Sequence, residues 1–402
     1  MAVLPRCILA FSGGLDTSLC VVYLRETLGY EVVTATVDTG AFDADELARI
    51  EQRSVETGAV AHFTVDATDE LYRNWIRHLV AGNYLKGSVY PLCVGVERVV
   101  QAEHMVRIAR EQGAVAICHG STGAGNDQIR FDAVLRTLAP DLKIIAPIRD
   151  LGWGRAQEAA YLAEHGHHVD ASTKTYSINA GLWGTTIGGG ETRTTEAVIP
   201  DHVYTRTKNP TTCSAEGRTV VIGFEKGEAV SLDGERLGPI PLLRKLDALA
   251  AEQGVGRGVH LGDTILGIKG RIAFEAPVAT ALITAHRELE KLVLTKHQQL
   301  IKEQIAQHYG LFLHEGRYLD PAMRDMEAFF DSSQQTVSGT VTLQLRQGHA
   351  NVLALSSPFS LLSATRAAYG EESGLWNGRD AEGFAKILSV QSMLAWQARG
   401  ES

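Results

Sequence analysis

The sequence predicts an α/β protein: a mostly parallel twisted sheet with helices on both faces, then an α+β domain, then a C-terminal helix. Short apolar runs alternate with amphipathic segments over the first 172 residues, as in a parallel sheet with crossover helices. Beyond Tyr176 the chain turns to Gly- and Thr-rich segments and alternating strands. We therefore expect domains at 1–172 and 173–378 and a separate helix at 379–402.

The first domain is expected to alternate strands with helices. Its strands are expected at 7–11, 32–37, 60–65, 114–118 and 144–146. Its main helices are expected at 17–26, 43–56, 94–112 and 127–138. Glycine-rich loops follow the first and fourth strands, so both loops should lie at the same edge of the sheet.

The second domain is expected to mix strands with long helices. Helices are expected at 241–253 and about 280–308, and paired strands at 340–345 and 351–355. The last helix, 381–397, has an apolar face with little chain left to cover it, made by Phe384, Ile387, Leu388 and Leu394. This face is expected to pack either between subunits or on its own domain.

Composition and charge exclude several classes of protein. The chain has 402 residues, 45% hydrophobic and 21% charged, unlike a disordered protein. Its net charge of -9 gives no positive field to attract nucleic acid. No apolar run approaches the roughly 20 residues of a membrane span or forms a signal-peptide core, so we expect a cytoplasmic protein. Five scattered cysteines without a C-x-x-C pair, and no metal-ligand spacing, indicate neither disulfides nor a metal centre.

A loop rich in glycine and hydroxyl groups follows the first expected strand. Residues 12–18, SGGLDTS, open a helix, where backbone N–H groups and the helix dipole favour anions. Gly13 and Gly14 allow close approach of the backbone, and Ser12, Thr17 and Ser18 add hydroxyl donors. A tight turn alone would explain two glycines but not this whole run. The loop is therefore predicted to bind phosphate, without a Walker Gly-Lys-Ser/Thr sequence.

SGGLDTS is the signature of the PP-loop family of ATP pyrophosphatases, and within that family the chain resembles argininosuccinate synthase. The resemblance is carried by AFSGGLDTS (10–18), YEVVTATVDTG (30–40) and HGSTGAGNDQIRFD (119–132), and it continues to SPFSL (357–361). It implies a ligase with a nucleotide-binding domain, an acceptor-binding synthetase domain and a C-terminal oligomerisation helix. Such enzymes are commonly homotetramers.

The resemblance also implies a reaction and a nucleotide site. ATP, with Mg²⁺ on its β and γ phosphates, activates the ureido oxygen of citrulline, and the amine of L-aspartate then displaces AMP. Ser12, Asp16, Asn126 and Arg130 are expected to act in catalysis. The expected nucleotide contacts are Ala10, Phe11, Ser12, Gly13, Gly14, Leu15, Asp16, Thr17, Ser18, Val37, Asp38, His119, Gly120 and Gly125.

Two substrate sites are implied in the same way. Thr122, Asn126 and Asp127 match aspartate-binding positions, where hydroxyl and amide donors fix a carboxylate and Asp127 can pair with an ammonium. Taken alone, the Gly-Asn-Asp run at 125–127 could be only a helix cap. The citrulline or citrulline-like acceptor is expected to contact Tyr90, Gly95, Asn126, Arg130, Ser177, Thr186, Gly262 and Phe274.

The acceptor pocket departs from the family pattern. Val94 and Gly95 replace hydroxyl residues, Gly262 replaces a glutamate that pairs with the amino end of citrulline, and Phe274 replaces a tyrosine. A buried ammonium without a counter-ion is costly. We therefore expect a ureido, amide or related acceptor that lacks a free α-amino group or is bulkier than citrulline. The alternative is an ordinary argininosuccinate synthase in which another residue, such as Asp263, supplies the carboxylate.

Other classes share the phosphate loop. A PP-loop tRNA-modifying enzyme needs a basic RNA-binding surface and usually paired cysteines, which the net charge of -9 and the cysteine spacing disfavour. A non-catalytic descendant would have a degraded acceptor pocket, but it would not need the intact phosphate loop and the Asn126–Gln128 run.

Overall fold

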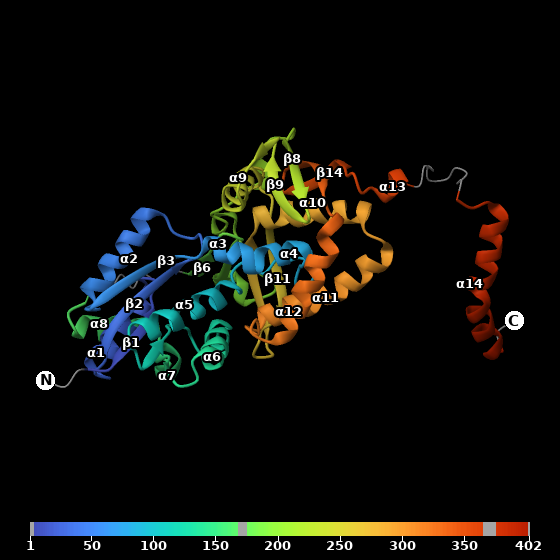
Figure 1. The fold of residues 1–402 in the computed structure, drawn as a ribbon. Helices are drawn as coiled ribbons and strands as arrows, with labels where there is room; N and C mark the ends of the chain where they lie inside the picture. Colours follow the sequence, from blue (N-terminus) through green and yellow to red (C-terminus); the bar gives the residue numbers. More distant parts are fainter. Residues whose placement is uncertain (1–3, 168–174, 365–374, 401–402) are drawn as a thin grey trace.

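The computed structural model describes residues 4–167, 175–364 and 375–400 (Figure 1). The expected boundary between residues 172 and 173 lies outside the described residues. In Figure 1 the N-terminal sheet, the second domain and the last helix follow one another along an elongated molecule.

The N-terminal domain contains the predicted parallel sheet. Its strands are β1 (Arg6–Ala10), β2 (Glu31–Asp38), β3 (Ala61–Asp66), β4 (Ala116–Cys118) and β5 (Lys143–Ile145). The spatial order is β3-β2-β1-β4-β5, and every neighbouring pair is parallel. Because the chain builds β2 and β3 on one side of β1 and then β4 and β5 on the other, the order reverses between β1 and β4. Crevices at such points are the usual ligand sites of open α/β sheets.

Helices cover both faces of this sheet, as the alternation predicted. One face packs against α1 (Leu15–Glu26), α2 (Ala44–Glu56), α7 (Pro147–Leu151) and α8 (Arg155–Glu164). The other packs against α5 (Glu97–Glu111) and α6 (Asp127–Leu138). Along β1, Cys7 and Leu9 belong to the first core and Ile8 to the second, which is the period-two pattern of a strand buried on both sides.

A short helical segment after β3 leaves the N-terminal sheet and packs into the second domain. It comprises α3 (Thr68–Leu71), the π-helical turn η1 (Tyr72–Ile76) and α4 (Arg77–Ala81). The fully buried Trp75 lies 4.9 Å from Tyr318, centroid to centroid, and the Tyr72 hydroxyl donates to Glu228 over 2.9 Å. This segment joins the two domains through one continuous apolar core.

The second domain has two antiparallel sheets. One has the order β10 (Glu235–Arg236), β9 (Glu228–Leu232), β8 (Arg218–Glu225), β13 (Gly339–Arg346) and β14 (His349–Ser356). The other has the order β11 (Arg257–Asp263), β12 (Lys269–Glu275), β7 (Thr185–Gly189) and β6 (Tyr176–Ala180). The remaining elements are α9 (Pro239–Glu252), α10 (Pro277–Val293), α11 (Lys296–His314), α12 (Pro321–Ser333), α13 (Leu361–Ala364), and the 3-10 turns Gly190–Arg193, Asp201–Val203, Pro210–Thr212 and Gln334–Thr336.

The single long helix expected at about 280–308 is wrong. The chain forms two helices, α10 and α11, because Thr295 has extended backbone (φ -66°, ψ 158°) and caps the second one. The Gln298 backbone N–H donates to the Thr295 hydroxyl over 3.3 Å, and the Thr295 N–H donates to the Gln298 side chain over 3.0 Å. The sequence T-x-x-Q at 295–298 matches a capping box. It lies within an apolar pattern that continues from one helix into the next, so the break was not predicted.

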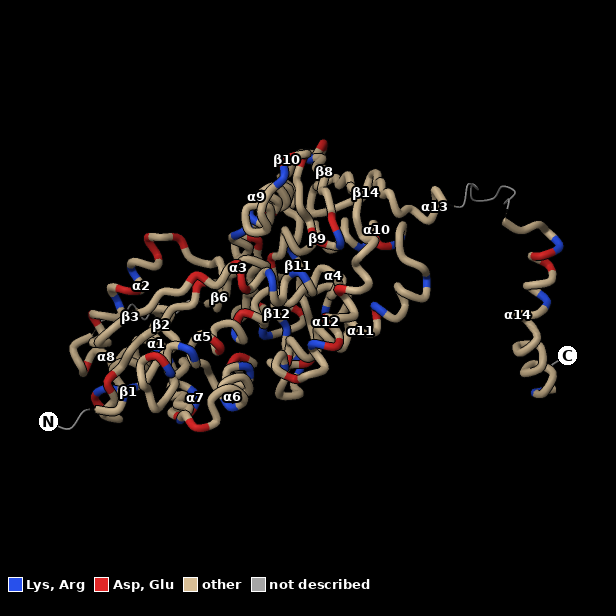
Figure 2. The backbone as a smooth tube through the Cα atoms, in the orientation of Figure 1, with Lys and Arg blue, Asp and Glu red and all other residues tan. Residues whose placement is uncertain are grey.

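The last helix, α14 (Gly378–Ala398), stands apart from the rest of the chain in Figure 1, and all its side chains are exposed. Charged residues of both signs are mixed over most of the molecule, whereas residues 387–398 of α14 carry none (Figure 2). Within the described parts of the chain, no helix is long and apolar enough to cross a membrane.

Candidate active site

A cavity of about 780 Å³ lies where the carboxyl ends of β1, β2 and β4 face the second domain. Its walls come from both domains: the two glycine loops on one side, and β6, β7, β11 and the end of α11 on the other. The cavity therefore occupies the crevice where the strand order of the parallel sheet reverses.

The first glycine loop joins β1 to α1. Its backbone N–H at Ser12 donates to the Thr17 hydroxyl over 3.4 Å, and that hydroxyl donates to the Gly14 carbonyl over 3.3 Å. Gly13 has φ +71°, and a β-carbon there would lie 3.2 Å from Ile50, so the turn requires glycine. Ser12 and Asp16 line the cavity beside the start of α1, where an anion is favoured.

The second glycine loop joins β4 to α6 and touches the first, since a β-carbon at Gly120 would lie 3.0 Å from the Thr17 methyl. His119 opens this loop. Its Nε2 lies 3.1 Å from Asp132, its Nδ1 accepts the Ser121 N–H over 3.3 Å, and its ring stacks on Phe131. The imidazole thus supports the loop.

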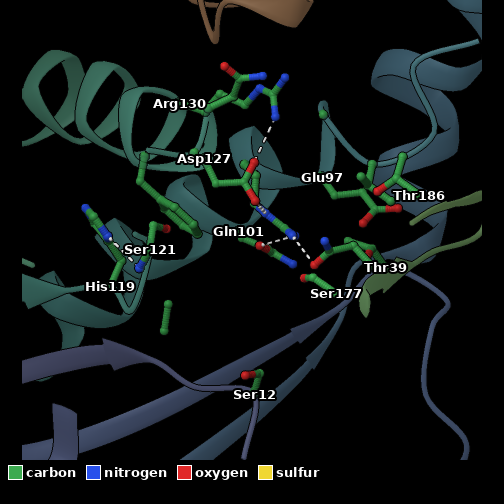
Figure 3. Close-up of a pocket in the computed structure, with 18 of the residues that line it drawn as sticks. Ser12, Thr39, Glu97, Gln101, His119, Ser121, Asp127, Arg130, Ser177 and Thr186 are labelled. Carbon is green, nitrogen blue, oxygen red and sulfur yellow. Dashed lines mark hydrogen bonds and ion pairs between the residues drawn. The ribbon is translucent and has the colours of Figure 1, made fainter. Parts of the chain in front are cut away.

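Asp127 lies at the centre of the cavity wall, at the start of α6 (Figure 3). One carboxylate oxygen accepts from Arg98 Nε over 3.0 Å and the other from Arg130 Nη1 over 2.8 Å. Although burial opposes ionisation, these two guanidinium groups hold the pKa of Asp127 at about 2. The carboxylate is therefore ionised and held in place by both arginines.

The arginines extend this network to the second domain. Arg98 donates to Asn179 on β6 over 3.2 Å, and Arg130 Nε donates to the His314 carbonyl at the end of α11 over 2.9 Å. The side-chain oxygen of Asn126 accepts the backbone N–H of Ile265 over 2.9 Å. The predicted substrate residues Asn126 and Arg130 thus also hold the two walls of the cavity together.

The glycines of the acceptor end make room for larger neighbours. A β-carbon at Gly262 would lie 2.5 Å from His260 Nε2, and one at Gly95 would lie 3.2 Å from Arg130 Nη2. His260 stacks on Tyr90 with 5.4 Å between ring centroids. Two of the departures from the family pattern therefore have a packing reason within this chain.

Glu97, at the start of α5, is a buried carboxyl on the cavity wall. Its Oε1 has no hydrogen-bond partner among the described residues, and burial raises the pKa of Glu97 to about 8. Any side chain at position 181 would collide with this carboxyl, so Gly181 provides its space. Figure 3 shows Glu97 beside Thr39 and Thr186.

Most of the residues expected from the sequence line this one cavity. Those that do so are Ala10, Phe11, Ser12, Asp16, Thr17, Val37, Tyr90, Gly95, His119, Gly120, Thr122, Gly125, Asn126, Asp127, Arg130, Ser177, Thr186 and Gly262.

The remaining expected residues do not line it. Leu15 and Ser18 are on the buried side of α1, while Gly13 and Gly14 shape the turn behind Ser12. Asp38 is turned away because its carboxylate accepts the backbone N–H groups of residues 40 and 41, over 2.9 and 3.1 Å. Phe274 packs behind Tyr90, with 5.3 Å between ring centroids, and is itself buried.

Several cavity residues were missed from the sequence: Lys86, Glu97, Gln101, His260 and His314. They belong to a loop, two helix ends and a strand that are far apart in sequence. No local motif marks them. The one available signal is that Glu97 closely follows Val94 and Gly95, which depart from the family pattern.

Two family models match the chain: the argininosuccinate synthase N-terminal HUP domain over residues 6–168 and the C-terminal domain over residues 176–395. The argininosuccinate synthase of Xanthomonas campestris is 44% identical, covering 96% of this chain and 97% of its own length. Those of Methanocaldococcus jannaschii and Pyrococcus furiosus are 39% and 36% identical, over 96% and 97% of this chain and 97% and 94% of their own lengths. The chain therefore belongs to the argininosuccinate synthase family of ATP-dependent ligases.

Proposed function

We propose that this chain joins citrulline to L-aspartate at the expense of ATP, forming argininosuccinate, AMP and pyrophosphate. The observation that carries the proposal is the single cavity in which two glycine loops meet the Arg98–Asp127–Arg130 network at the strand-order reversal. The full-length relatives named argininosuccinate synthase support citrulline over the altered acceptor expected from the sequence.

In this proposal, catalysis rests on positioning and on charge. The ATP phosphates lie on the loop of Ser12 and Asp16, with the nucleoside against Val37. Asp127 faces the aspartate ammonium, while Thr122 and Asn126 provide donors for its carboxylates. Arg130 positions the ureido oxygen of citrulline for attack on the α-phosphate of ATP, which releases pyrophosphate, and the aspartate amine then displaces AMP from the adenylated carbon.

Mg²⁺ is proposed to enter with the nucleotide on its β and γ phosphates. The donor set of the first loop suits such an ion, because the Asp16 carboxylate lies on the cavity wall beside the hydroxyl group of Ser12. Mg²⁺ is commonly held by one or two carboxylates together with substrate phosphates. Its contribution when bound is to neutralise phosphate charge.

We also propose a homotetramer built with α14. Its uncharged stretch exposes Ile387, Leu388, Met393, Leu394 and Trp396, each at least 49% exposed in the isolated chain. An apolar face of this kind requires a partner surface, and symmetric self-association is the commonest solution.

The function is tested by measuring AMP and pyrophosphate release from MgATP and L-aspartate, with and without citrulline, and by mass spectrometry of the product. We expect citrulline-dependent AMP release and a product with the mass of argininosuccinate. The Asp16→Asn variant should lose most of this activity, whereas Asp141→Asn, at a surface ion pair with Arg110, should retain it. ATP and aspartate binding, seen as a raised Tm, without any citrulline turnover would refute the choice of citrulline.

A further inference from the structure

We propose that Lys86, His260 and His314 form an anion-binding subsite that holds the carboxylate of the acceptor. The inference rests on the proposed function, because it assigns an end group of the acceptor to one end of the same cavity. All three side chains line that cavity, next to Arg130 and Tyr90.

Lys86 and His314 lie in contact and form the first part of the subsite. The Lys86 ammonium donates to the Asp263 carbonyl over 2.8 Å and lies 2.7 Å from His314 Nε2. The other ring nitrogen of His314 lies 3.2 Å from Arg130 Nη2. Burial and then the two flanking cations, Arg130 and Lys86, lower the pKa of His314 to about 3, so the ring is neutral and cannot accept from both cations.

His260 supplies an independent observation. Its side chain is only 7% exposed, it lines the cavity, and its Nε2 has no hydrogen-bond partner among the described residues. The ring is held flat against Tyr90, and Gly87 and Gly262 leave the space it occupies. A buried ring nitrogen without a partner is costly unless a ligand satisfies it, and in the Nε2–H tautomer His260 would donate to a carboxylate.

The carboxylates near this end are already engaged. Asp127 is held by two arginines, and the exposed Asp263 carboxylate pairs with Lys269 over 2.6 Å. Glu315, which faces Lys86, pairs with Arg317 at 3.7 Å. Hydrogen-bond donors therefore outnumber free acceptors at this end of the cavity. Burial, and after it the positive charge of Arg130, lowers the pKa of Lys86 to about 8. A carboxylate offers two oxygens with about four acceptor positions, which matches this surplus.

The subsite predicts which end group of the acceptor matters most. Citrulline has both a carboxylate and an ammonium; 5-ureidopentanoate keeps only the carboxylate, and 4-ureidobutylamine keeps only the amine. Binding is measured by calorimetry on the full chain with a non-hydrolysable ATP analogue, so the result does not depend on turnover. We expect the first two compounds to bind within about threefold of each other and the amine to bind ~10- to ~100-fold more weakly, the range for lost charge-assisted hydrogen bonds.

Variants of Lys86 and His260 test whether these side chains bind the carboxylate of citrulline. Lys86→Met and His260→Phe, which keeps the stacking on Tyr90, should each weaken citrulline binding about tenfold or more without changing ATP binding. Lys86→Arg should recover much of the loss. Lys245→Met, at a surface ion pair with Glu235, is the control and should bind citrulline like the parent chain.

Two results would overturn the subsite: equal binding of 4-ureidobutylamine and citrulline, or unchanged citrulline binding in both Lys86→Met and His260→Phe. Failure of the proposed function looks different. In that case the carboxylate compounds still bind in the expected order, but citrulline and aspartate yield neither AMP nor argininosuccinate.

Discussion

At the residue scale, Asp127 is the charge on which the centre of the cavity depends. Arg98 and Arg130 both donate to it, so the neutral amide of Asp127→Asn would leave two guanidinium groups without their counter-ion. We expect kcat/KM for aspartate to fall at least ~30-fold, since breaking a buried charge pair costs about 2–5 kcal/mol.

The check on Asp127 is steady-state kinetics over pH, with Asp141→Asn, at the surface ion pair with Arg110, compared as a carboxylate outside the cavity lining. Because the pKa of Asp127 is about 2, the parent enzyme should show no activity loss from this group above about pH 4. Unaltered kcat/KM in Asp127→Asn would contradict its role.

Glu97 predicts an unusual pH dependence of stability. Burial raises its pKa to about 8 in the folded chain from an ordinary value of 4.5, so the folded state binds more protons than the unfolded state between these values. The free energy of unfolding should therefore decrease as pH rises through this window and then level off.

In the Glu97→Gln variant the side chain has no charge at any pH, and this part of the pH dependence should disappear. The variant should gain in Tm relative to the parent between pH 6 and pH 9, whereas the surface variant Glu252→Gln should not. Parallel Tm curves for parent and Glu97→Gln over that range would show that Glu97 is not protonated in the folded chain.

At the element scale, a buried lysine joins α4, α10 and α11. Lys302 on α11 donates to the Ala81 carbonyl at the end of α4 over 2.6 Å and pairs with Glu290 on α10 at 2.8 Å. Both side chains are almost fully buried. Lys302→Met would leave the Glu290 charge buried without its cation, and we expect it to destabilise the chain by about 3–5 kcal/mol.

Denaturant unfolding measures this cost. The double variant Lys302→Met with Glu290→Leu should recover much of the loss, because replacing both charges with apolar groups is often neutral. A small effect of Lys302→Met, similar to that of the exposed Lys291→Met, would contradict the prediction.

The elements that the sequence predicted well are those decided locally. The strands β2 and β3 end at Asp38 and Asp66, and the helix at 127–138 begins directly after a Gly-Asn pair, so their positions follow from patterns of a few residues. The break at Thr295 and the helices after β3 were missed. Near Thr295 the apolar pattern continues from one helix into the next with no glycine or proline to mark the break, and the helices after β3 are buried against a domain that comes later in the chain.

At the scale of the whole molecule, α14 predicts the oligomeric state. The full chain of 43.5 kDa should have about four times that mass in light scattering, if the proposed tetramer forms through this helix. A chain ending at residue 377 should give a smaller assembly. Leu388→Asp, within the apolar stretch, should also lower the mass of the assembly, whereas Lys386→Ala should leave it unchanged. An unchanged mass for the shortened chain would exclude α14 from the interface.

Local sequence patterns predicted the candidate site where it lies on the parallel sheet, whereas Ser177, Thr186 and Gly262 in the second domain were expected only from the family resemblance. Ser12, Asp16 and Asn126 follow strand ends, and strand ends meet at one edge whatever the rest of the chain does. Lys86, His260 and His314 come together through the packing of α4, β11 and α11. No short sequence pattern encodes that packing, so this wall required the structure.

The pairing of glycines with larger neighbours makes the effect of a substitution at one position of the cavity depend on the residue at the other. Glu97 needs the empty space at Gly181, His260 needs Gly262, and Arg130 lies against Gly95. A side chain at position 181 or 262 would have to displace Glu97 or His260, so Gly181→Ala and Gly262→Ala are each expected to lower the Tm. Substituting the glycine together with its larger partner by a smaller residue should restore part of the lost Tm. The two positions of each pair are therefore strongly epistatic.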